Sequence, residues 1–151
     1  MKTRARGRRS WNPSRPAAGE ESPHLVFAAL GDERFVSLTT FRRSGEPVST
    51  PVWVARDGDA LIVTTPRASG KVKRLRNSPR VELRPCSRMG HIDDDDTPVA
   101  GTAEIVTEVA PRRLTGLIRR KYGLEYRVVM GIERLARSGP SERVILRINP
   151  A

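Results

Sequence analysis

Residues 61–86, LIVTTPRASGKVKRLRNSPRVELRPC, place a basic segment between two runs that have strand character. The first run, Leu61–Thr65, is apolar and rich in β-branched residues, and the last, Val81–Cys86, alternates apolar and polar residues. Between them, residues 67–80 carry six Lys or Arg and no acid. Ser69-Gly70 is typical of the start of a short helix that Ser69 can cap, and the free backbone N–H groups and nearby cations there favour an anion. We therefore interpret this segment as an element that binds the phosphate group of a cofactor.

Length and composition bound the rest of the chain. Its 151 residues suit one domain with a single core. Residues 1–24 carry six Lys or Arg against two acids and have no apolar periodicity, which predicts a disordered basic arm before a domain at 25–151. No apolar run is long enough to span a membrane, residues 1–24 lack the apolar core of a secretion signal, and Cys86 has no partner for a disulfide. These features favour the cytoplasm.

The net charge of +11 by itself attracts polyanions, nucleic acid included. The basic arm holds a single aromatic residue, Trp11, and the sequence contains no motif that reads a nucleic-acid groove. We therefore expect no specific nucleic-acid partner and no membrane partner. A basic nucleic-acid-associated protein remains an alternative, which a salt-dependent affinity for DNA would support.

Six segments have strand character: residues 35–41, 47–55, 61–65, 81–86, 98–106 and 143–148. Short turns at 42–46 and at Asp57-Gly58-Asp59 join the first three, so we expect these to form a meander. Gly101 within the fifth strand predicts a bulge or a close backbone approach. Most pairings should be antiparallel, and six such strands can close into a small barrel that has no exposed edge.

Helical patterns lie on both sides of these strands. Residues 24–30 predict one or two helical turns, which end at Gly31-Asp32. Within residues 111–137, apolar residues recur at helical spacing, and Gly123 separates two helices. We expect their apolar face to pack on the barrel or on a second subunit rather than on a membrane.

Two stretches of this sequence, VSLTTFRRSGEPVSTPVW at 36–53 and SGKVKRLRNSPRVELRPC at 69–86, resemble the pyridoxamine-phosphate-oxidase-like split β-barrel superfamily. RRKYGLEYRVVMGIERL at 119–135 fits the same pattern. More narrowly, the chain is similar to the actinobacterial group of probable F420-dependent (deazaflavin) reductases. The resemblance runs from about Leu30 to Ile148. It implies a mainly β, six-stranded, mostly antiparallel split β-barrel with helices, in a homodimer whose cofactors lie at the subunit interface.

The resemblance also implies the residues that bind the cofactor. The phosphate would lie against the connection after the third strand, and the tricyclic ring would lie beside the second strand. The expected phosphate residues are Thr64, Thr65, Ser69, Gly70, Lys71, Lys73 and Arg74. The expected ring residues are Ser49, Thr50, Pro51, Val52 and Trp53.

The chemistry implied by the resemblance belongs mainly to the cofactor. Reduced coenzyme F420 would transfer a hydride to a small conjugated organic substrate, while the protein binds and orients both. This reading accommodates a sequence in which no nucleophile–base pair and no metal-ligand cluster can be named. His91 beside Asp93–Asp96 is more simply a solvated loop than a metal site. The alternatives are an FMN-dependent oxidase or reductase of the same fold and a non-catalytic F420 or haem carrier.

Overall fold

The computed structural model describes residues 23–106, 111–136 and 142–151. The prediction of a disordered arm therefore falls largely outside the described residues. Seven strands form one sheet in the order β2-β1-β5-β6-β7-β4-β3, and every pairing is antiparallel. They are β1 (Val36–Phe41), β2 (Pro47–Val52), β3 (Val54–Asp57), β4 (Ala60–Pro66), β5 (Arg80–Pro85), β6 (Val99–Val106) and β7 (Arg143–Pro150).

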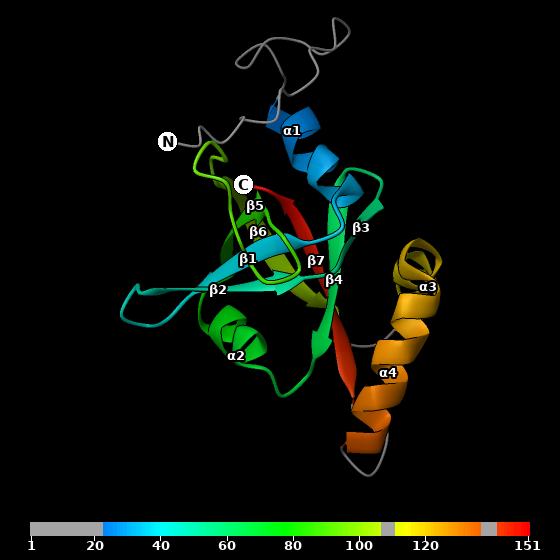
Figure 1. Cartoon of the computed structure of the whole chain (residues 1–151). Coiled ribbons are helices and arrows are strands. Elements are labelled where there is room, and N and C mark those ends of the chain that lie inside the picture. The colour runs from blue at the N-terminus through cyan, green and yellow to red at the C-terminus, as the bar shows by residue number, and fades with distance from the viewer. Residues whose placement is uncertain (1–22, 107–110, 137–141) are drawn as a thin grey trace, which may run out of the picture.

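The sheet curls on itself, as Figure 1 shows, and encloses a cluster of buried apolar side chains. The helices are α1 (Pro23–Ala29), α2 (Gly70–Asn77), α3 (Pro111–Tyr122) and α4 (Leu124–Ala136), and a 3-10 turn, η1 (Leu30–Asp32), follows α1. Phe27 of α1 and Val72 of α2 are fully buried in the same interior cluster as Leu38, Val63 and Leu146 of the sheet. These two helices thus fill the interior that the strands surround.

The expected six strands are seven because the segment 47–55 does not form one strand. It breaks at Trp53, so that β2 pairs with β1 while β3 pairs with β4 at the other edge of the sheet. The expected three-strand meander is therefore wrong, and two separate hairpins stand in its place. The mainly antiparallel β architecture with helices is confirmed.

The turns and the glycine positions follow the sequence closely. Gly45 and Gly58 have φ of 87° and 61° in the two hairpin turns, and Gly123 has φ of 52° between α3 and α4. Such angles favour glycine because they place a Cβ in steric conflict. At Gly101 a Cβ would come within 3.1 Å of the Asn149 carbonyl oxygen, which confirms the close backbone approach expected there.

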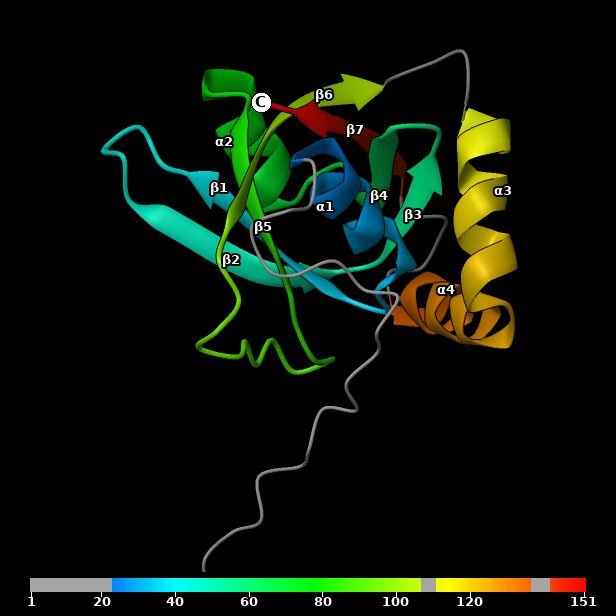
Figure 2. The ribbon, with the colours of Figure 1, turned by 90° about the horizontal axis from the view of Figure 1, so that it is seen from above.

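Helix α3 covers the outer face of one part of the sheet (Figure 2). Its Leu114, Ile118 and Tyr122 are buried against Ala55, Ile62 and Ile145, which come from β3, β4 and β7. The expected packing of this helical region on the sheet is confirmed for α3. Helix α4 instead leaves several large apolar side chains exposed: Leu124, Val128, Ile132 and Leu135.

Candidate functional site

A hollow of about 200 Å³ lies among β2, β4, α2, α4 and β7. The end of β2 with Trp53 and the end of β4 form two of its sides, and Phe35, α2, α4 and the start of β7 complete it. Its lining consists of Phe35, Pro51, Val52, Trp53, Thr64, Thr65, Pro66, Lys71, Val129 and Arg143. The lining has an aromatic and apolar part and a cationic part, and the two cations are Lys71 and Arg143.

The cationic part follows from strand pairing. Pro66 at the end of β4 lies opposite Arg143 at the start of β7, so the guanidinium of Arg143 reaches back along β4. Its Nε donates to Thr64 Oγ1 at 3.1 Å, and its Nη2 donates to the Thr64 carbonyl at 3.3 Å. Lys71 enters the hollow from the first turn of α2, the helix that follows β4.

Lys71 is held in a place that disfavours its charge. Burial lowers the pKa of its ammonium below the usual value, and the nearby guanidiniums of Arg74 and Arg143 lower it further. Lys71 is thus a half-buried cation that lies beside two other cations. A bound anion would reverse this penalty, because an opposite charge nearby favours the charged form of a lysine.

The start of α2 differs from the expected capping. Ser69 occupies the N-cap position, but its side chain makes no capping hydrogen bond to the helix. Its hydroxyl accepts from Thr65 Oγ1 at 3.2 Å instead. The N–H groups of the first turn of α2 therefore receive no side-chain acceptor from Ser69, which is the property of an anion-binding helix start.

Six of the twelve sequence-predicted site residues line the hollow: Pro51, Val52, Trp53, Thr64, Thr65 and Lys71. Of the others, Ser69 bonds Thr65, and Ser49 lies on β2 with its hydroxyl 2.6 Å from that of Thr39. The Thr50 hydroxyl is buried and has no hydrogen-bond partner among the described residues. These assignments to a cofactor site stay predictions.

The remaining three lie on α2. Lys73 is exposed, and Gly70 begins the helix. Arg74 turns toward the sheet, where its Nε donates to Thr40 Oγ1 at 2.6 Å, and its Nη1 would lie 2.7 Å from a Cβ added at Gly70. Arg74 thus docks α2 on β1 at the edge of the cationic region, outside the lining of the hollow.

Phe35, Pro66, Val129 and Arg143 are lining residues that sequence reasoning missed. Arg143 is separated by almost eighty residues from the strand it pairs with, and the sequence does not state which strands are neighbours. Val129 belongs to the apolar periodicity of α4, which predicted only packing. The one available signal for Arg143 was its position as a basic residue at the start of an apolar strand.

The aromatic lining residue Trp53 is positioned by contacts with two tyrosines. Trp53, the residue between β2 and β3, stacks on Tyr122 with ring centroids 4.9 Å apart, and Tyr126 lies 5.9 Å away. The Tyr122 hydroxyl accepts from the Val54 N–H at 3.0 Å and donates to the Arg34 carbonyl at 2.7 Å. Burial raises the pKa of this phenol, so it stays protonated and able to donate.

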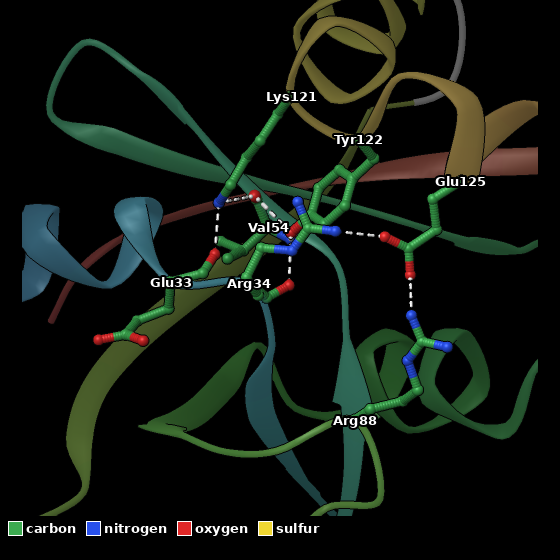
Figure 3. A network of polar contacts seen from close by, with 7 residues as sticks. All are labelled: Glu33, Arg34, Val54, Arg88, Lys121, Tyr122 and Glu125. Carbon is green, nitrogen blue, oxygen red and sulfur yellow. Dashed lines mark hydrogen bonds and ion pairs between the residues drawn. The ribbon is translucent and has the colours of Figure 1, made fainter.

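A polar network extends from this tyrosine, as Figure 3 shows. The Lys121 ammonium donates to the carbonyls of Gly31 and Val54, each at 2.7 Å, and to the Glu33 carbonyl. Glu125, at the start of α4, forms ion pairs with Arg34 and Arg88. The network joins the end of α3 to the backbone at residues 31–34 and at Val54, and it ties the start of α4 to Arg34 and Arg88.

The described residues contain no group of three or more His, Cys, Asp or Glu arranged to hold a metal ion. No helix among them is long and apolar enough to cross a membrane. Burial and the nearby Glu33 raise the pKa of the Cys86 thiol, which disfavours the nucleophilic thiolate.

The family model described as pyridoxamine 5'-phosphate oxidase matches residues 23–151. The chain belongs to the pyridoxamine 5'-phosphate oxidase family. Its curled antiparallel sheet is the split barrel of that family, with seven strands here. A search of curated proteins gave no match.

Solved structures of this superfamily have the same fold as the chain. A conserved hypothetical protein from Mycobacterium tuberculosis is 24% identical, with a TM-score of 0.59 over 86% of this chain and 81% of that one. An F420 reductase is 22% identical, with a TM-score of 0.54 over 83% and 93%. The heme storage protein of Vibrio cholerae is 14% identical, with a TM-score of 0.54 over 80% and 83%. At these identities the likeness shows the fold, and the fold carries different ligands in different members.

Proposed function

We propose that this member of the pyridoxamine 5'-phosphate oxidase family is an oxidoreductase that uses coenzyme F420. It would transfer a hydride from the reduced deazaflavin to a small conjugated organic substrate. The observation that carries the proposal is the two-part lining of the hollow. Lys71 and Arg143 form its cationic part, and Phe35, Trp53 and Val129 contribute to its apolar part. A ligand with a phosphate group and a flat ring system matches both parts.

The donors in this site fit such a ligand. Lys71 and Arg143 would hold the phosphate together with the N–H groups at the start of α2, because all of these are donors and the first two carry charge. Pro51, Val52 and Trp53 would place the ring system and keep water from it. When bound, the reduced cofactor supplies the hydride. The chain itself binds, orients and excludes solvent.

A homodimer is part of the proposal. The hollow of about 200 Å³ is smaller than the roughly 300–1,000 Å³ typical of ligand pockets, so one chain encloses only part of a tricyclic cofactor. Val129 of α4 lines the hollow, and α4 carries the exposed stripe Leu124, Val128, Ile132 and Leu135. A second copy packed on this stripe would bury it and complete the enclosure.

The F420 reductase among the solved structures supports the choice of cofactor, and the heme storage protein represents the main rival. Fluorescence titration of the purified protein with F420 and with FMN, at low and at raised salt, tests the proposal. We expect F420 to bind in the low micromolar range. A screen of conjugated compounds should then identify a substrate that oxidises the reduced cofactor in the presence of the protein. Preference for FMN would reassign the cofactor. If neither F420 nor FMN binds, and added haem gives the Soret band of a bound haem, the protein would be a haem carrier rather than an F420-dependent enzyme.

A further inference from the structure

A second hollow, of about 430 Å³, lies at the other end of α2 from the candidate cofactor site. The turn between β1 and β2 forms one side, and the end of α2 with the start of β5 forms the other. Arg42, Arg43 and Arg80 line it together with Phe41 and Asn77. None of these residues lines the first hollow, so the function proposed above does not account for them.

The turn that carries two of the arginines is held by its own backbone. The Arg42 N–H donates to the Glu46 carbonyl at 2.9 Å, and the Gly45 N–H donates to the Arg42 carbonyl at 2.8 Å. Gly45 closes the turn with φ of 87°, which a residue with a Cβ rarely adopts. Arg43 donates to Asn77 Oδ1 at 3.2 Å, so its guanidinium is oriented by a neutral partner and keeps its charge available.

A flat stacking surface forms another part of the hollow. The Arg80 guanidinium carbon lies 4.3 Å from the centre of the Phe41 ring. A guanidinium in contact with a ring through one face can accept an aromatic group on its other face, and bases are bound in this way by arginine and aromatic side chains. The hollow thus combines a stacking plane with two cations on a fixed turn.

The charge around the hollow is unbalanced. Its carboxylates are Glu46, 3.9 Å from Arg42, and Glu82, 3.0 Å from Arg80. Arg42 also helps to lower the pKa of Arg74, after the larger effect of burial, so its charge repels other cations. The exposed face of α2 adds Lys73 and Arg76 beside Asn77. An anionic ligand would relieve this repulsion.

We propose that this second hollow binds single-stranded nucleic acid, with a base against Arg80 and its phosphate against Arg42 and Arg43. Neighbouring phosphates would lie along Lys73 and Arg76 of α2. Stacking is tolerant of base identity. The binding is therefore independent of sequence, in keeping with a chain that contains no motif for reading a groove. It is also independent of the cofactor.

The test is the affinity of the full chain for a labelled oligothymidylate, measured by fluorescence anisotropy at several salt concentrations. The variant Arg42→Ala/Arg43→Ala removes two charges from the hollow. The variant Arg120→Ala/Arg127→Ala removes two charges from the exposed surface of α3 and α4. We expect the first to weaken binding by about tenfold or more and to reduce the salt slope by about one to two units. The second should change the affinity by less than about threefold, since distant surface charges are screened.

Arg80→Lys separates stacking from charge, because it keeps the cation and removes the plane. It should weaken oligothymidylate binding by about tenfold, since stacking of one base accounts for a change of that order. Heparin, an anion without bases, should bind Arg80→Lys and the unmutated chain equally. Competition with AMP distinguishes a nucleic acid from a free nucleotide as the ligand. If AMP displaces the labelled oligothymidylate when the two are present at equal concentrations, the site would belong to a free nucleotide.

Two results would overturn the proposal. Equal loss of affinity in the two double variants would show that the affinity depends on net charge alone and not on this hollow. Unchanged oligothymidylate affinity in Arg80→Lys would show that no base stacks on the Arg80 guanidinium. Thermal melting of each variant confirms that it is folded, and F420 titration of the same variants shows whether the first hollow is intact.

Discussion

Lys71 is a residue whose position is unfavourable for the fold alone. Burial and two neighbouring guanidiniums lower its pKa, so the folded chain holds its charged form at a cost. A group with this property is common at sites that bind ligands, where the ligand supplies the missing opposite charge. Arg143 lines the hollow beside it and adds a second cation that an anionic ligand could contact.

Replacing Lys71 with methionine should therefore separate binding from stability. Lys71→Met should weaken F420 binding by about 1.5–3 kcal/mol, the range for hydrogen bonds to charged groups. It should leave the melting temperature unchanged or raise it, because a cation that the fold disfavours has been removed. Lys73→Met is the matched control, since Lys73 is an exposed lysine of the same helix and lies outside the hollow. Equal losses in the two variants would contradict the site.

The pH dependence of binding should depend on the same lysine. Because the anion favours charged Lys71, affinity should be highest below the lowered pKa of the free protein and should fall as pH rises through it. That fall should begin at lower pH than an ordinary lysine would give. Lys71→Arg keeps its charge throughout this range, so its affinity should stay level. Titrations of both proteins with F420 from neutral to alkaline pH measure the difference, and parallel curves would exclude Lys71 from the phosphate site.

At the residue scale, the sequence predicted those members of the site that lie within or next to the basic connection. The charge of the basic connection after the β4 strand pointed to Lys71, and the family resemblance supplied Thr64 and Thr65. Arg143 was missed because it reaches the hollow through the pairing of β4 with β7, a contact between distant segments. Ser69 was expected to cap the helix, but its hydroxyl accepts a hydrogen bond from Thr65 Oγ1 instead.

The break between β2 and β3 is the element that the sequence concealed. Residues 47–55 are rich in β-branched and aromatic residues on both sides of Pro51. Such a composition does not record that a strand changes its neighbour. The chain leaves the β1 edge after Val52 and joins β4 from Val54, with Trp53 between the two pairings. The pattern of single strands was thus predictable, whereas the order of strands in the sheet required the structure.

Tyr122 holds this break in place and should control the position of Trp53. Tyr122→Phe keeps the stacked ring and removes the hydroxyl that bonds the Val54 N–H and the Arg34 carbonyl. We expect it to destabilise the fold by about 1–3 kcal/mol, the cost of leaving buried backbone groups without a partner. Tyr122→Leu removes the stack as well and should shift the Trp53 emission toward longer wavelength, measured with Trp11→Phe as background. An unchanged spectrum in Tyr122→Leu would show that the stack does not position the indole.

Asp57 joins three elements and should govern acid stability. It accepts from Arg113 of α3 at 2.7 and 3.0 Å and from Arg147 of β7, and these bonds hold the pKa of its carboxyl well below the usual range. A lowered pKa contributes stability that is present above the pKa of the unfolded chain and is lost as pH falls toward the folded value. Asp57→Asn should cost about 1–3 kcal/mol at neutral pH. The difference should shrink below about pH 4. The free energy of unfolding is measured in urea, with Asp59→Asn in the same turn as the control. Equal effects of the two substitutions would contradict a specific role of Asp57 in acid stability.

At the scale of the molecule, one chain leaves two features incomplete. Its cofactor hollow is small for the proposed ligand, and α4 presents apolar side chains that it does not cover, with Leu124 77% and Ile132 61% exposed. Contiguous exposed apolar surface marks interaction sites in proteins. One operation, the packing of a second copy on α4, would resolve both features.

Val128→Asp/Ile132→Asp should therefore convert the proposed dimer into monomers, and F420 binding should weaken with it, because the proposal has the second copy complete the site. Sedimentation equilibrium at micromolar concentration measures the association. Leu25→Asp/Met89→Asp is the matched control, since it places two aspartates at exposed apolar positions of α1 and the 87–97 loop. Both double variants reduce a net charge of +11 by the same amount and so weaken repulsion between copies equally. Dissociation of the α4 variant alone would thus reflect loss of apolar contact, and a persistent dimer would place the interface elsewhere.

Raised salt gives an independent check. Screening should strengthen the association of two basic chains, whereas it should weaken their binding of an anionic cofactor.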